Sequence, residues 1–121
     1  MIKQIVLFSC CFLLFACVQK DDEVFCTEEF VYGLSITITD ADSGEVITEN
    51  ITVTATDGNY TEELMAFFDF TNFVGAGERP GTYTIHISAE GYEEFVSQPI
   101  EVGANECHVI PEVRSFQIQP L

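Results

Sequence analysis

Residues 34–39 read Leu-Ser-Ile-Thr-Ile-Thr and carry the clearest structural pattern in the chain. Apolar and hydroxyl side chains alternate with a period of two, which is the period of a β-strand and not that of a helix. β-Branched residues on one face and hydroxyls on the other suit a strand with one buried face. The stretch therefore predicts a half-buried strand.

The same alternation recurs further along the chain. Residues 51–56 read Ile-Thr-Val-Thr-Ala-Thr, and residues 83–88 read Tyr-Thr-Ile-His-Ile-Ser. Val113 and Phe116 change parity, which predicts a bulge in the last strand. Short segments rich in Gly, Asp and Asn separate the runs. About seven short strands with such turns predict one all-β domain, an antiparallel β-sandwich.

The charge of the chain limits its partners. Its 121 residues include four basic and 20 acidic side chains, a formal net charge of −16. Such a field repels phosphate backbones, so we expect no nucleic-acid partner, and it disfavours lying flat on an anionic membrane. The acidity serves solubility, and clustered carboxylates leave Ca²⁺ as the one cofactor still open. Otherwise we expect no cofactor.

The N-terminus predicts the compartment. Lys3 precedes an apolar run over residues 5–15, which is too short to span a membrane and is typical of a signal peptide ending at residue 16. Residues 14–17, Leu-Phe-Ala-Cys, resemble the lipobox of bacterial lipoproteins, which implies that Cys17 is lipidated and becomes the first residue. A competing match ends at Cys10, but cleavage there would expose an apolar run. An ordinary signal on a secreted protein is the alternative.

The residues that follow Cys17 predict the side of the membrane. They resemble the acidic tag that directs lipoproteins of some Gram-negative bacteria to the outer face of the outer membrane. The tag residues are Gln19, Lys20, Asp21, Asp22 and Glu23. We therefore assign residues 17–25 to the lipidated cysteine and an acidic tether, and residues 26–121 to the domain. A plain solvated tether facing the periplasm is the alternative.

Two cysteines remain in the domain, Cys26 near its start and Cys107 near its end. The cell envelope is oxidising, so we expect a disulfide, with two free thiols as the alternative. Closing a loop of roughly 80 residues contributes about 4.5 kcal/mol in the chain-entropy model.

A family resemblance extends over about two-thirds of the mature chain. Gly-Leu-Ser-Ile-Thr-Ile-Thr-Asp at 33–40, Ser-Gly-Glu-Val-Ile at 43–47 and Ile-Thr-Val at 51–53 resemble the opening of the carboxypeptidase regulatory-like (transthyretin-like) domain. Pro-Gly-Thr-Tyr-Thr-Ile at 80–85, followed by Gly-Tyr at 91–92, resembles its second half. The resemblance implies a prealbumin-like Greek-key sandwich that serves structure or binding, without the zinc-dependent catalytic domain.

No set of residues predicts catalysis or a metal site. His86 and Ser88 share a strand face, but no third residue orients the imidazole. The fragment at 106–108, Glu-Cys-His, lacks the further ligands that zinc needs. Residues 40–45, Asp-Ala-Asp-Ser-Gly-Glu, begin like a calcium loop, but Ile51 stands where an EF-hand has its last Glu, so a turn is preferred. We therefore expect no enzyme.

The apolar segment at residues 64–70 lacks a clear period and predicts either a buried strand or a surface patch. The patch candidates are Leu64, Met65, Phe67, Phe68 and Phe70. The sequence thus predicts a lipid-anchored, surface-exposed lipoprotein of the outer membrane that acts as a non-catalytic binding or assembly module for a protein or glycan. The alternatives are a periplasm-facing accessory subunit of an outer-membrane complex and a hydrolase.

Overall fold

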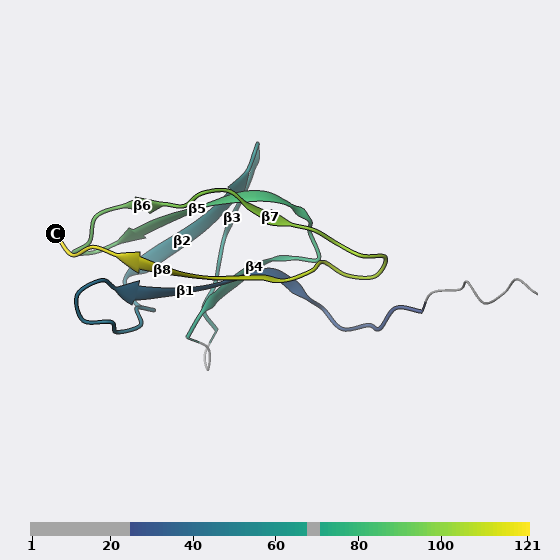
Figure 1. Ribbon diagram of the computed structural model, residues 1–121, viewed down its shortest axis with the longest axis horizontal. Helices are drawn as coiled ribbons and strands as arrows, with labels where there is room; N and C mark the ends of the chain where they lie inside the picture. Colours follow the sequence, from purple (N-terminus) through teal and green to yellow (C-terminus); the bar gives the residue numbers. More distant parts are fainter. Residues whose placement is uncertain (1–24, 68–70) are drawn as a thin grey trace, which may run out of the picture.

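The computed structural model describes residues 25–67 and 71–121, which form eight β-strands and no helix (Figure 1). The strands are β1 (Tyr32–Asp40), β2 (Ile51–Asp57), β3 (Tyr60–Glu63), β4 (Phe73–Gly77), β5 (Gly81–Ala89), β6 (Phe95–Val96), β7 (Ile100–Val102) and β8 (Glu112–Ile118). They form two facing sheets, which confirms the predicted all-β sandwich. The described residues offer no helix that is long and apolar enough to cross a membrane.

The smaller sheet has the order β4-β1-β8. Strand β1 is antiparallel to β4 but parallel to β8, in unbroken register from Leu34 opposite Glu112 to Asp40 opposite Ile118. The sandwich is therefore antiparallel except at this one pairing, and the expected bulge in the last strand is wrong, because the register of β8 is unbroken. The chain reaches β8 by crossing over from the other sheet, which allows parallel pairing. Val113 is simply an apolar residue on the outer face, 67% exposed.

The larger sheet has the order β3-β2-β5-β6, and β7 also pairs with β5. Strands β2 and β3 form a hairpin in which Asp57 lies opposite Tyr60. Gly58 in its tight turn has φ 62°, a conformation that glycine adopts without steric cost. Strand β3 is the first strand in this order, so it is an edge strand, and it has only four residues.

The core lies between the sheets and is built by the alternating apolar residues. Ile36 and Ile38 of β1 and Tyr83 and Ile85 of β5 are completely buried. Burial of each large apolar side chain stabilises the fold by about 1.5–3 kcal/mol. The hydroxyl-bearing residues between them face outward or are half-buried, as the period-two pattern requires.

The parallel pairing decides which ends of the molecule meet. Because β1 and β8 run in the same direction, the segments 25–31 and 103–111 that lead into them lie at the same end of the sandwich. The C-terminus lies at the opposite end (Figure 1). The end at which segment 25–31 enters β1 is therefore built from two segments far apart in the sequence.

Candidate functional site

Several sequence-predicted site residues lie outside the described part of the chain. They are Cys17, Gln19, Lys20, Asp21, Asp22, Glu23, Phe68 and Phe70. Lipidation, the export tag and part of the apolar patch therefore stay predictions.

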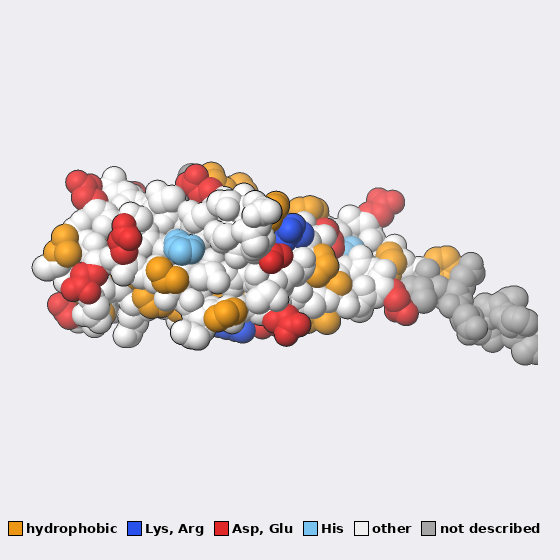
Figure 2. Space-filling model, turned by 90° about the horizontal axis from the view of Figure 1, so that it is seen from above, with side chains coloured by type: hydrophobic (Ala, Val, Ile, Leu, Met, Phe, Trp, Pro, Cys, Tyr) orange, Lys and Arg blue, Asp and Glu red, His pale blue; other side chains and the backbone are white. Residues whose placement is uncertain are grey.

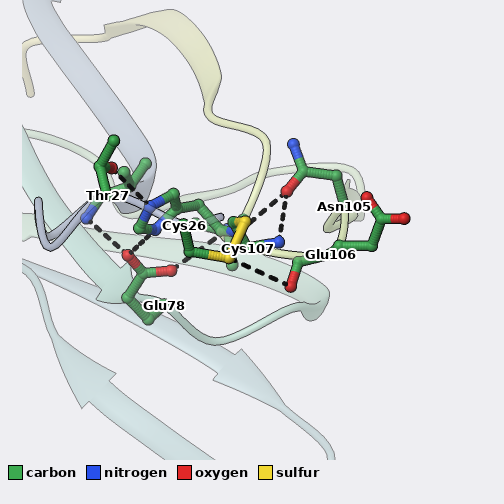
Figure 3. A network of polar contacts seen from close by, with 9 residues as sticks. Cys26, Thr27, Glu78, Asn105, Glu106 and Cys107 are labelled. Atoms are coloured by element: carbon green, nitrogen blue, oxygen red, sulfur yellow. Dashed lines mark hydrogen bonds and ion pairs between the residues drawn. A yellow bond between two sulfur atoms is a disulfide. The ribbon is translucent and has the colours of Figure 1, made fainter. Parts of the chain in front are cut away.

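A disulfide closes the end at which the tether enters. Cys26 is bonded to Cys107, with Cα atoms 5.2 Å apart, so segment 25–31 is joined to the loop that leads into β8 (Figure 3). Asn105 shapes that loop, because its Oδ1 accepts hydrogen bonds from the backbone N–H groups of Cys107 and His108, at 2.8 and 2.9 Å. This end of the domain is thus held covalently and by a local turn.

Glu78, beside the disulfide, joins three segments through its carboxylate (Figure 3). It accepts hydrogen bonds from the backbone N–H groups of Val31 (3.0 Å) and Val109 (3.3 Å) and from His108 Nδ1 (2.6 Å). Burial raises the pKa of Glu78, but the bonds from His108 and from the two backbone groups outweigh this effect and lower the pKa. His108 Nε2 lies 3.1 Å from Thr27 Oγ1, which gives segment 25–31 a second contact with the loop that leads into β8. We call these residues and the disulfide the clamp.

A second polar cluster lies over the edge strand β3. The Arg79 guanidinium stacks on the Tyr60 ring, 3.6 Å from its centroid, and Nη1 lies 3.1 Å from Asp57 Oδ2 and 2.9 Å from the Tyr83 hydroxyl. The hydrogen bond to Tyr83 and the ion pair with Asp57 raise the pKa of Arg79. The Tyr60 hydroxyl donates to Glu62 at 2.8 Å, and this bond raises the pKa of Tyr60. Each group is paired within the fold, so the cluster stabilises the β3 edge.

The fragment that resembles a calcium loop forms a turn. Asp40 Oδ1 accepts the backbone N–H groups of Asp42 and Ser43 at 2.7 and 2.8 Å, and Oδ2 accepts the Tyr92 hydroxyl at 2.6 Å. The bond from Tyr92, followed by those from the backbone, lowers the pKa of Asp40. Gly44, with φ 78°, completes the turn. Across residues 25–67 and 71–121, no group of three or more His, Cys, Asp or Glu side chains is arranged to hold a metal ion.

The structure divides the predicted apolar patch. Leu64 is 1% exposed and packs in the core between the sheets, so it is not part of a surface patch. Met65 and Phe67 are 51% and 45% exposed. Phe67 lies 6.4 Å from the Tyr32 ring, and Tyr32 in turn lies 5.1 Å from Phe30, measured between ring centroids. The exposed surface therefore extends toward the tether segment, which sequence spacing could not show.

A cleft of about 330 Å³ lies between the two sheets along one side of the sandwich. Its walls come from the segment that includes β6 and the start of β7 on one side and from β8 on the other: Phe95, Val96, Ser97, Gln98, Pro99, Ile100, Arg114 and Phe116. Phe95 and Phe116, one from each wall, lie 5.0 Å apart between ring centroids. Ser97 fixes the first wall, because its Oγ accepts the Ile85 N–H at 2.9 Å and donates to the Gln98 carbonyl at 2.8 Å.

No pattern in the sequence indicated the cleft or the Glu78 contacts. The two cleft walls are separated along the chain and meet only through packing of the sheets, and Glu78 lies in a turn that no period describes. His86 and Ser88 are exposed on β5, and no side-chain hydrogen bond of the described residues joins them. The 106–108 fragment is used in the clamp, through Cys107 and His108.

No protein-family model and no curated protein matches this chain. The resemblance to the carboxypeptidase regulatory-like domain therefore stays a prediction from the quoted motifs.

Proposed function

We propose that the chain is a lipid-anchored, surface-exposed outer-membrane lipoprotein that binds a partner protein without catalysis, on a domain of the carboxypeptidase regulatory-like type. The lipobox ending at Cys17 and the acidic residues after it support the location. The cleft beside β8 supports the binding function, because it is a preformed, open and mainly apolar cleft of the size that ligand sites have.

Strand β8 offers backbone groups at the mouth of this cleft. It is the last strand of its sheet, and among the described strands only β1 pairs with it. The Ile118 carbonyl accepts the Ala41 N–H at 2.9 Å, so the even-numbered residues of β8 direct their backbone groups toward β1. Val113, Ser115 and Gln117 consequently direct theirs outward. An edge of this kind can pair with an extended segment of another protein.

The surface charge favours a basic partner segment. Residues 17–121 keep three of the four basic residues against all 20 acidic ones, a formal net charge of −17. Figure 2 shows one face of the molecule with carboxylates scattered over it and few basic side chains. The two described arginines are already paired, Arg79 with Asp57 and Arg114 with Glu112. The partner segment would place an apolar side chain against Phe95 and Phe116 and basic groups near the rim.

Two measurements test the proposal. Protease treatment of intact cells should cleave the wild type, and Cys17→Ala should lose membrane attachment; a membrane-bound but protected protein would place it in the periplasm. For the cleft, the test is co-purification of a crosslinked partner with wild type and Ser115→Pro. Proline at 115 removes an outward N–H and leaves the bonds to β1 intact.

Ser115→Pro should lose the partner while its melting temperature stays close to that of the wild type. Val96→Lys, at a site 56% exposed on the cleft rim, provides a second variant that the fold should tolerate. Retention of the partner by both variants would show that binding occurs elsewhere.

A further inference from the structure

An exposed aromatic surface begins where the tether joins the domain. Phe30, Tyr32 and Phe67 form a continuous row, with ring centroids 5.1 and 6.4 Å apart. Phe30 is 63% and Phe67 45% exposed, and Tyr32 between them is half-buried. We call these three residues the aromatic row. Adjoining exposed apolar surface of this kind usually marks a site of contact.

The clamp fixes this row relative to the tether. Cys26 is bonded to Cys107, and the Val31 N–H donates to Glu78, so both ends of the segment that carries Phe30 are held against the domain. The Phe30 ring also lies directly over Gly77, where a Cβ atom would collide with it. The position of the Phe30 ring is therefore fixed relative to Cys26, near the point at which the N-terminal chain enters the domain.

The chain before the domain is short enough to keep the row within reach of the membrane. Cys17 and Phe25 are eight residues apart, which spans at most about 26–29 Å when fully extended. This end of the sandwich thus stays within that distance of the lipid in which the anchor is inserted, and the C-terminus lies at the far end (Figure 1).

We propose that the aromatic row contacts the membrane–water interface beside the lipid anchor. The proposal rests on lipid anchoring at Cys17. Phenylalanine and tyrosine side chains partition into the interfacial region, where apolar rings leave water and polar groups stay hydrated. Glu28 and Glu29 are exposed in the same segment, so contact should be stronger on zwitterionic than on anionic lipid.

The chain contains no tryptophan, so one substitution supplies a unique fluorescent reporter. Full-length Phe30→Trp and Phe67→Trp proteins are reconstituted into phosphatidylcholine vesicles with and without brominated acyl chains. The matched control is Val113→Trp, an apolar site 67% exposed on the outer face of β8. We expect both row variants to show blue-shifted emission and to lose most of it to the bromolipid, while Val113→Trp keeps its emission. Added phosphatidylserine should weaken the quenching.

The other outcomes overturn the proposal and separate it from the anchor. Vesicles that float with the protein while no reporter is quenched would refute membrane contact by the row and leave anchoring intact. Equal quenching of all three reporters would refute membrane contact made by the row in particular. Failure of the protein to float with vesicles would refute lipid anchoring and this proposal together.

Discussion

Replacing Cys26 and Cys107 together by serine measures how much the disulfide stabilises the sandwich. The bond joins residues 81 positions apart, at the entrances to β1 and β8. In the chain-entropy model, a covalent loop of this length lowers the free energy of folding by about 4.5 kcal/mol, because it restricts the unfolded chain. A domain of this size is stable by about 5–15 kcal/mol, so the loss is a large part of the total. The Glu78 contacts should still hold the two segments together in the folded variant.

The assay is equilibrium urea unfolding of the wild type with and without dithiothreitol and of the double serine variant. With a urea slope of about 1–3 kcal/mol per M, the midpoint should fall by about 1.5–4.5 M. Reduced wild type should coincide with the variant, and the variant should not respond to dithiothreitol. A loss below about 1 kcal/mol would refute the loop-closure account, since the model assigns several times more to this loop.

Three further predictions concern single sites. The lowered pKa of Glu78 means that its carboxylate stabilises the fold at pH values above the ordinary pKa of 4.5, and that this stabilisation is lost as the pH falls through the folded pKa. Glu78→Gln should therefore make the urea midpoint less dependent on pH in the acid range, and Glu90→Gln serves as the control. Gly75→Ala would place a Cβ against Leu64 and Glu62, so thermal melts should show a loss of about 1–3 kcal/mol. Gly103→Ala, which has open space around it, should lose little. Ca²⁺ should leave the Tm unchanged because both Asp40 oxygens are bonded, and a rise in Tm that EDTA reverses would contradict this.

The expected disulfide illustrates how far the sequence could go. Composition and compartment favoured pairing of Cys26 with Cys107, since they were the two cysteines left in the domain. The sequence could not place Glu78 and His108 beside that bond, because they come from a turn and a loop whose contacts span 30 residues. The sequence left open whether Leu64 belongs to a buried strand or to a surface patch for a similar reason: one residue of an irregular segment turns inward and the next turns outward.

The sequence by itself determined the fold class and the inward face of the long strands, because a period of two reports directly which side chains leave water. Only the tertiary structure decided that β1 and β8 run parallel, that β3 and β8 are edges, and that a cleft opens beside β8. The pairing of strands depends on how the two complete sheets pack around one core. The alternation of apolar and polar residues within a strand is compatible with several such pairings. The cleft and the clamp depend on those pairings, so no local pattern could predict them.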